Sequence, residues 1–280
     1  MSFNNLNDEG VSAVCEAIQS NKETKLTSLN FGYNDIGPVG ANAVAAMVAV
    51  TGALTSLDIR SNDIVGDGAA KLSAAVLGNL KIEMFNEIPI KEMRANSITE
   101  LDLKGKGIGF EGGLVVAGLI PVMGALTSIN LSGNILTNYG RDMTGITELA
   151  AALGVNGSLT SLDVRSNDIV GDGAAQLSAA VLGNLKIEMF NEIPIKEMRA
   201  NSITELDLKE KRLGVEGGMV VAGLLPVMGS LTSINLSENA LTNYSKDMMG
   251  INELAAALGA NGALTNLKYV HVRPNMWAKL

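Results

Sequence analysis

The sequence predicts an α/β solenoid, in which a short unit of strand, turn and helix stacks on copies of itself. Residues 54–72 have the pattern L-x-x-L-x-L-x-x-N-x-I followed by apolar residues at helical spacing. The stretch returns almost unchanged at residues 159–177. One such unit cannot bury its apolar edge alone, whereas stacked units share a core. Looser versions of the pattern begin at Leu26, Ile98, Leu126, Ile203, Leu231 and Leu264.

Each part of the unit follows from its residue pattern. Residues 57–60 alternate apolar and polar side chains, which is the period of a half-buried strand. Residues 62–68 contain the glycines of a tight turn, and Asp67 is expected to cap the helix that follows. Residues 69–77 place an apolar stripe on that helix. Parallel strands joined in this way take a right-handed crossover, with the strands on a concave face and the helices on a convex face.

Asn62 is the polar residue that the pattern requires. An asparagine side chain carries both donor and acceptor groups, so it can satisfy backbone groups of its own unit and the next where water is excluded. We therefore expect a structural ladder of buried asparagines. Its other members are Asn34, Asn134, Asn167 and Asn239.

The chain begins with a unit that has the turn and helix but no strand, over residues 1–25. The first complete strand is expected at Leu26, and the next helix runs from Pro38 to about residue 50. Pro38 fits the first position of a helix because its missing N–H has no partner there. A second strand at Leu54 and a helix over residues 67–77 complete the regular start.

A different unit follows at residues 80–97. Residues 80–89 alternate like a strand and include their own asparagine, but the next strand begins at Ile98. The space between them allows only one short helical turn, over residues 89–94. We expect this thin outer layer to bend the solenoid locally.

The unit that begins at Ile98 has Lys106 at the ladder position, and its duplicate has Lys211 there. These long cationic side chains are expected to reach solvent while their stems pack. The helix over residues 111–123 contains Pro121, which should distort its end. A strand at Leu126, a loop and a helix over 145–153 close the set.

Residues 54–158 and 159–263 align without a gap and differ at 17 positions. We call them cassette one and cassette two. We expect one repeat domain over residues 1–280, with lead units at 1–53, the two cassettes, and a terminal cap at 264–280 that includes Tyr269 and Trp277. Any surface feature of one cassette should therefore appear twice.

The pattern, with strands about 28 residues apart and a helix in each unit, resembles the ribonuclease-inhibitor-like class of leucine-rich repeats. That class includes ribonuclease inhibitors, Ran GTPase-activating proteins and the sensor arms of NOD-like receptors. The resemblance implies a horseshoe-shaped α/β solenoid that binds proteins. It gives weak guidance on the individual partner, because one fold serves many functions.

Composition limits the functional classes. The net charge of −8 disfavours nucleic acid, whose phosphates require a basic face. Cys15 and His271 are the single cysteine and histidine, so no internal disulfide or Cys/His metal cluster is possible. Cys15 is expected to be a small buried hydrophobe. No cofactor is expected.

The N-terminal residues and the apolar segments favour a cytosolic or nuclear protein without a membrane anchor, and we expect a cytoplasmic location. Residues 1–5 are polar and no apolar run follows them, so we expect no signal peptide. The longest apolar segment, residues 114–123, is too short to span a bilayer.

Side chains between the core positions of each strand should point to the concave face. One alternative is that pairs such as Asp58 and Arg60 only neutralise each other, and Phe85 and Phe190 can instead turn into the core. Both alternatives stay open at this point. The candidate partner-binding residues are Asp58, Arg60, Glu83, Phe85, Asp102, Lys104, Asp163, Arg165, Glu188, Phe190, Asp207 and Lys209.

The expected function is a non-catalytic protein–protein interaction scaffold. The carboxylates of Glu100 and Asp102 have no accompanying nucleophile or metal cluster, and the glycines of residues 105–109 form the repeat turn and lack the phosphate-loop pattern. One alternative is regulation of a small GTPase, as the Ran GTPase-activating proteins would imply. Another is a structural or engineered repeat without a partner. Self-association through the N-terminal end is a further possibility.

Overall fold

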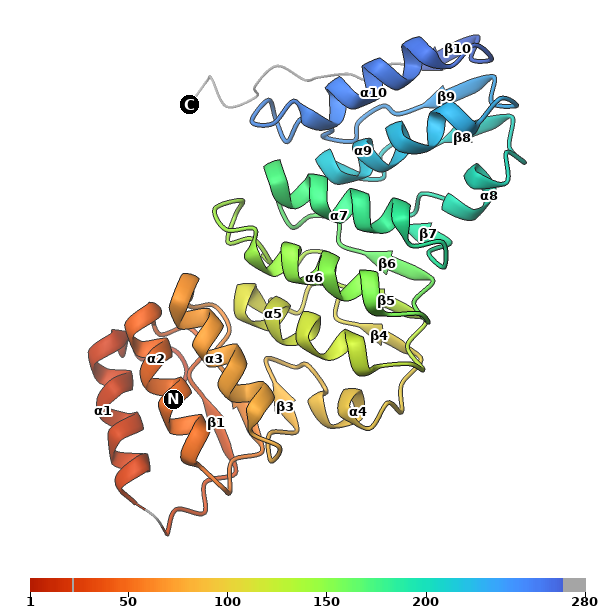
Figure 1. Cartoon of the computed structure of the whole chain (residues 1–280). Helices are drawn as coiled ribbons and strands as arrows, with labels where there is room; N and C mark the ends of the chain where they lie inside the picture. Colours follow the sequence, from red (N-terminus) through yellow and green to blue (C-terminus); the bar gives the residue numbers. More distant parts are fainter. Residues whose placement is uncertain (22, 269–280) are drawn as a thin grey trace.

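The computed structural model describes residues 1–21 and 23–268, and Figure 1 shows them as one elongated stack. The helices are α1 (Asn7–Ser20), α2 (Pro38–Val50), α3 (Gly66–Gly78), α4 (Ile90–Arg94), α5 (Gly109–Leu119), α6 (Thr144–Val155), α7 (Gly171–Gly183), α8 (Ile195–Arg199), α9 (Gly214–Leu224) and α10 (Met249–Ala260). The strands are β1 (Ser28–Asn30), β2 (Ser56–Asp58), β3 (Met84–Phe85), β4 (Glu100–Asp102), β5 (Ser128–Asn130), β6 (Ser161–Asp163), β7 (Met189–Phe190), β8 (Glu205–Asp207), β9 (Ser233–Asn235) and β10 (Asn266–Lys268).

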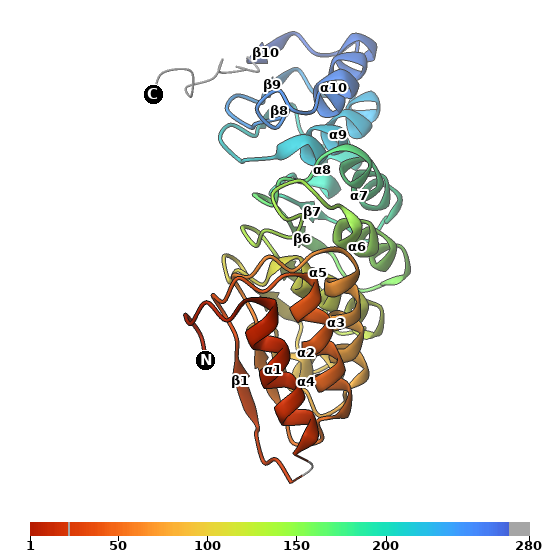
Figure 2. The same cartoon turned by 90° about the vertical axis from the view of Figure 1, so that its left-hand side faces the viewer.

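Helices lie on one side of the stack and strands on the other, as Figure 2 shows. This arrangement confirms the predicted α/β solenoid. We call the surface formed by strand side chains that point away from the helices the strand face. Among the described residues, no helix is long and apolar enough to cross a membrane.

The strands form three parallel sheets rather than one. Their orders are β1-β2-β3, β4-β5-β6-β7 and β10-β9-β8. Each break follows the strand of a short unit, where α4 or α8 replaces a full helix. The longer helices on either side contact each other directly, α3 with α5 and α7 with α9, while α4 and α8 lie to the side of their row (Figure 1). The thin outer layer therefore interrupts the sheet.

One apolar core runs through the described part of the chain. Leu57 and Ile59 from β2 and its end, and Leu72 and Val76 from α3, are fully buried in it. Cys15 is also fully buried, and burial raises the pKa of its thiol to about 12. It is the small hydrophobe that the sequence predicts.

The predicted asparagine ladder is present. Asn134, for example, is fully buried. Its Oδ1 accepts the N–H of Ile108 at 3.3 Å, and its Nδ2 donates to the carbonyls of Leu103 and Leu131 at 2.8 and 2.9 Å. One side chain thus joins two neighbouring units where water does not reach.

An arginine secures each short unit to the helix before it. The Arg94 guanidinium donates to the carbonyls of Val76 and Leu77 at the end of α3, at 3.0 and 2.9 Å, and to the carbonyl of Ile82 at 2.9 Å. Arg199 makes the equivalent bonds at the end of α7. These bonds satisfy carbonyl groups that a helix end leaves without partners.

The predicted geometry of the helix ends is confirmed in one place and wrong in another. At Pro121 the helix α5 gives way to a 3-10 turn, η1 (Ile120–Val122), and its duplicate α9 gives way to η2 (Leu225–Val227). Asp67 does not cap α3. It lies inside the first turn of a helix that begins at Gly66, and that helix has no side-chain cap.

The sequence analysis also predicted the wrong phase for the strands of the short units, that is, which of their side chains face the core. Alternation places Lys81 opposite Ser56, but the register pairs Ser56 with Met84 and Leu57 with Phe85. The difference of three residues exchanges the two sides of the strand. Phe85 is therefore a fully buried core residue, and the partner-binding role predicted for it is corrected.

Phe190 is fully buried in the same way, because β7 repeats this register against β6. Of the predicted terminal cap, the strand β10 lies within the described residues. Tyr269 and Trp277 lie outside them, and so does His271.

Candidate functional site

The strand face carries three rows of side chains. Within each sheet, the strand register aligns a first row of mostly serine, methionine and glutamate, and a second row of asparagine and aspartate. A third row, at the strand ends, includes the cations Arg60, Lys104, Arg165 and Lys209. The first row is Ser28, Ser56, Met84, Glu100, Ser128, Ser161, Met189, Glu205, Ser233 and Asn266. The second row includes Asn30, Asp58, Asp102, Asn130, Asp163, Asp207 and Asn235.

Arg60 is held by intramolecular bonds. Its Nε and Nη2 donate to the two carboxylate oxygens of Asp58 at 2.9 and 2.8 Å. Its Nη1 donates to Glu87 and, at 3.0 Å, to the carbonyl of Lys106, two units away. Lys106 in turn pairs with Glu87 at 3.0 Å, and its side chain is 47% exposed, so it reaches solvent as predicted. The mutual neutralisation of Asp58 and Arg60 is thereby confirmed.

The same cluster recurs in cassette two. Arg165 pairs with Asp163 at 2.6 Å and with Glu192 at 2.7 Å, and it donates to the carbonyl of Lys211 at 3.0 Å. Lys211 pairs with Glu192 at 2.7 Å. Each arginine therefore spans a short unit and joins the two regular units beside it.

Electrostatics agree with this structural role. Burial alone would raise the pKa of Asp58, but the hydrogen bonds and charge of Arg60 outweigh it and hold that pKa below its usual value. A partner that engaged Arg60 would have to replace these bonds. We therefore regard Arg60 and Arg165 as parts of the scaffold.

The remaining predicted residues lie on the surface, in two settings. Glu83 and Glu188 precede the strand face and pair with Lys91 and Lys196, each at 2.8 Å. Such exposed pairs contribute little, about 0–1 kcal/mol. Asp102, Lys104, Asp207 and Lys209 lie exposed along β4 and β8, at the edges of the sheet breaks.

Within the described residues, Lys104 has no ion pair, whereas Lys209 pairs with Glu210 at 2.8 Å. The difference comes from the sequence, because cassette one has Gly105 where cassette two has Glu210. The two otherwise similar strand ends therefore present different charges.

Two methionines were missed by the sequence analysis. Met84 and Met189 stand in the first row, 38% and 37% exposed. Methionine adapts its shape to different surfaces, which suits a binding site. The missed phase of the short units hid them, because alternation alone assigned both side chains to the core.

Glu111 was also missed, and so was its duplicate Glu216. Both are nearly fully buried at a helix start. The Nδ2 of Asn86 donates to Glu111 at 2.8 Å, and that of Asn191 donates to Glu216 at 3.2 Å. Burial raises the pKa of each carboxyl to about 8, against the opposing effect of these bonds.

The carboxyls of Glu111 and Glu216 accept hydrogen bonds from Asn86 and Asn191, the asparagines of the preceding units. They do so in the units where Lys106 and Lys211 interrupt the asparagine ladder. The lysine at the ladder position is visible in the sequence. It was the one signal that another side chain must take the place of the missing asparagine. In the described part of the chain, no group of three or more His, Cys, Asp and Glu residues is placed to hold a metal ion.

A family model described as "Leucine Rich repeat" matches residues 1–15, 22–45, 54–73 and 155–178. Bovine (Bos taurus) "NACHT, LRR and PYD domains-containing protein 5" is 24% identical over 249 residues, which cover 84% of this chain and 21% of that protein. The chain thus spans about a fifth of the length of this curated relative.

The chain is also similar to two solved structures. The leiomodin-1 actin-binding site 2 has a TM-score of 0.37 and 19% identity, and the match covers 62% of this chain and 89% of that one. The leucine-rich repeat-containing protein LegL7 from Legionella pneumophila has a TM-score of 0.33 and 17% identity, with coverage of 92% and 89%.

Proposed function

Because this chain is a leucine-rich-repeat protein of the ribonuclease-inhibitor-like class, we propose that it is a non-catalytic scaffold that binds a protein partner on its strand face. Proteins with such repeats generally serve as interaction scaffolds. We place the chain in the cytoplasm, where its single cysteine, Cys15, would stay reduced.

The observation that supports this proposal is the exposed set along β4 and β8, together with the exposed methionines of β3 and β7 across each sheet break. Met84 supplies a soft apolar side chain, and Glu100, Asp102 and Lys104 supply exposed charges. Protein interfaces typically combine apolar contacts with charged residues that help to select the partner. The duplicate set begins at Met189.

The duplication favours a partner that meets two similar surfaces. The cassettes, residues 54–158 and 159–263, would act as two display units on one stack. A partner with two equivalent binding segments would gain affinity if both engage, provided that its spacing fits.

Affinity capture from a cell lysate tests the proposal. We expect wild type to retain a partner that the variant Met84→Ala/Lys104→Ala/Met189→Ala/Lys209→Ala loses. Lys71→Gln is the matched control, since Lys71 lies exposed on α3 and cassette two already has glutamine there. Circular dichroism checks that all three proteins fold. A partner retained by the strand-face variant and lost by the control would contradict the proposal.

Two alternatives have their own readouts. Stimulated GTP hydrolysis by a small GTPase would favour a regulatory role, and failure to capture any partner would favour a structural or engineered repeat. We also propose self-association through the N-terminal end. Among the described strands β1 pairs only with β2, so its other edge is open to a second strand. Sedimentation at increasing protein concentration tests it.

A further inference from the structure

The two ends of the stack carry complementary halves of one repeat unit. Residues 1–20 form the turn and the helix α1 of a unit without a strand, whereas β10 is a strand that no helix follows among the described residues. Figure 1 shows α1 at one end of the stack and α10 with β10 at the other. A repeat unit buries its apolar surface against its neighbours, so each half exposes a surface that a further unit would cover.

Residues 1–20 already stand in register as the unit before β1. The backbone N–H of Asn4 donates to Oδ1 of Asn34 at 3.0 Å, and the N–H of Asn34 donates to Oδ1 of Asn62 at 3.0 Å. The asparagine ladder therefore continues into this half unit. The part that it lacks is a strand beside β1, whose outer edge has no partner among the described strands.

The free end beside α10 exposes apolar positions that cassette one buries. Leu267 of β10 is 46% exposed, whereas its counterpart Leu162 in β6 is fully buried. Ala255 of α10 is exposed, whereas its counterpart Ala150 in α6 is buried. In cassette one the following units cover these positions, and the described part of the chain holds no helical unit after β10. The difference in burial therefore outlines the surface that a further unit would cover.

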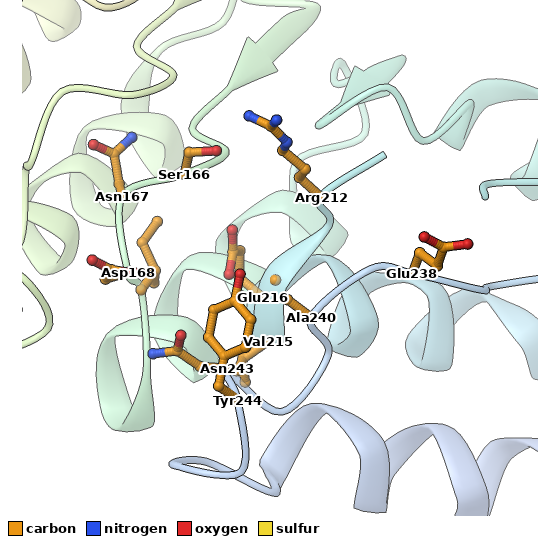
Figure 3. Close-up of a pocket in the computed structure, with 12 residues that line it drawn as sticks. Ser166, Asn167, Asp168, Arg212, Val215, Glu216, Glu238, Ala240, Asn243 and Tyr244 are labelled. Carbon is orange, nitrogen blue, oxygen red and sulfur yellow. The ribbon is translucent and has the colours of Figure 1, made fainter. Parts of the chain in front are cut away.

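The loop before α10 divides its large side chains between two directions. Asn243 and Tyr244 line a cavity of about 390 Å³ with Asp168 and Glu216 from preceding units, and Figure 3 shows the ring of Tyr244 among the residues that line it. These two side chains therefore belong to the contact with the preceding units. Met248, at the start of α10, is 49% exposed.

The internal duplicate shows how Met248 would pack against a further unit. In cassette one its counterpart Met143 lies over Gly173 at the start of α7, where a Cβ on this glycine would stand 2.8 Å from the Met143 Cβ. Gly10 has the corresponding position in α1, but the nearest neighbours of its Cβ position are atoms of Leu6, in its own half unit. A methionine from another unit therefore finds at Gly10 the same kind of place that Met143 occupies.

The two ends also match in size and charge. Ala13 and Ala17 lie on the same face of α1 as Gly10 and are exposed, so a second helix can approach this face closely. The helix α1 contains three acidic residues and no basic one. At the other end, Lys246 and Lys268 are exposed and make no ion pair among the described residues. Charges of opposite sign on two surfaces favour their association in one orientation.

We propose that the chain associates head to tail, so that β10 of one copy pairs in parallel with β1 of a second copy and α10 of the first packs against α1 of the second. Together β10 and α1 then complete one repeat unit that bridges the two copies. The arrangement repeats contacts within the chain, where β5 pairs in parallel with β6 and α6 packs against α7. Because two different surfaces meet, each copy keeps a free end and further copies can add. The inference rests on the proposed self-association and names the surface of the second copy.

Blocking one end at a time tests this arrangement. The N-end variant is Ala13→Lys/Ala17→Lys and the C-end variant is Met248→Glu/Ala255→Glu, and all four residues are exposed. We expect sedimentation velocity to show association of wild type that grows with concentration, and a loss of association for each variant alone. An equimolar mixture of the two variants should form a dimer and nothing larger, because each pair of molecules has one intact end of each kind.

Thermal unfolding checks that the variants fold, and Lys71→Gln should associate as wild type does. Association of the C-end variant alone would show that N-terminal ends meet each other, which overturns the head-to-tail contact but keeps the proposed self-association. A mixture that stays monomeric while wild type associates would also overturn it. Wild type that stays monomeric at every concentration would overturn both. The strand-face variant should associate as wild type does, which separates this contact from partner binding.

Discussion

At the scale of single residues, Glu111 and Glu216 show how the scaffold tolerates an interrupted ladder. Each takes a hydrogen bond from the asparagine of the unit before it while Lys106 or Lys211 turns to solvent. An isolated buried carboxylate is costly, so the protonated form is favoured in the folded chain. The folded state therefore binds protons that the unfolded state releases.

This proton uptake predicts a pH dependence of stability. The pKa of both carboxyls rises from the usual value of 4.5 to about 8 in the folded chain. Their contribution is fully present below about pH 4.5 and is lost as the pH rises towards 8. Urea unfolding from pH 5 to 9 should show falling stability for wild type and a flatter profile for Glu111→Gln/Glu216→Gln, which should be the more stable protein at pH 9.

The carboxyls whose pKa is lowered, such as Asp58 and Glu87, do not obscure this window. Their effect on stability lies below their unfolded pKa values of about 4. A double variant with the same slope as wild type between pH 5 and 8 would show that Glu111 and Glu216 do not titrate there.

At the scale of elements, the short units determine how the stack is divided. A five-residue helix replaces a full one, the sheet ends, and the flanking helices meet directly. Arginines bridge the resulting gap from two sides. Arg60 joins the strand ends, and Arg94 joins α4 to the end of α3.

Loss of the Arg94 bonds should destabilise the chain measurably. Arg94→Met keeps the apolar stem but leaves the carbonyls of Val76 and Leu77 without this donor. We expect a loss of about 1.5–3 kcal/mol in the free energy of unfolding, the usual range for a hydrogen bond to a charged group. Denaturant unfolding measures it, and Arg199→Met is an internal replicate.

The two changes lie in separate short units, so their effects should add in the double variant. Lys91→Ala is the control, because its exposed pair with Glu83 contributes little. A change below about 0.5 kcal/mol for Arg94→Met would contradict a capping role for this arginine.

Sequence patterns predicted the positions of the strands and helices better than they predicted which side of each strand faces the core. Regular units have leucine or another large apolar residue at each expected core position, so their strands and the asparagine ladder follow directly. The short unit has Leu80, Ile82, Met84 and Phe85, and two adjacent apolar residues fit either phase. Packing decided it, with Phe85 buried and Leu80 79% exposed. Glu111 was missed because an acidic residue in the first turn of a helix is usually exposed.

At the scale of the whole molecule, the chain is a repeated display on an interrupted sheet. Periodicity defined the solenoid because each unit must bury the same positions. It did not define the site, since the exposed positions carry no such constraint. Asp58 and Arg60 are bonded to each other, whereas Asp102, Lys104 and their duplicates stay exposed beside the sheet breaks.

Binding on the strand face is best tested by hydrogen exchange of the chain, measured by mass spectrometry with and without its captured partner. Residues 72–104 are identical to residues 177–209, so peptides from within them cannot be assigned to one cassette. Peptides that include Gly105 or its counterpart Glu210 differ in mass and report on each cassette separately. We expect slower exchange at residues 98–107, 203–212 or both, with unchanged exchange in the middle of α2 and α3. Protection confined to the helices would contradict binding on the strand face.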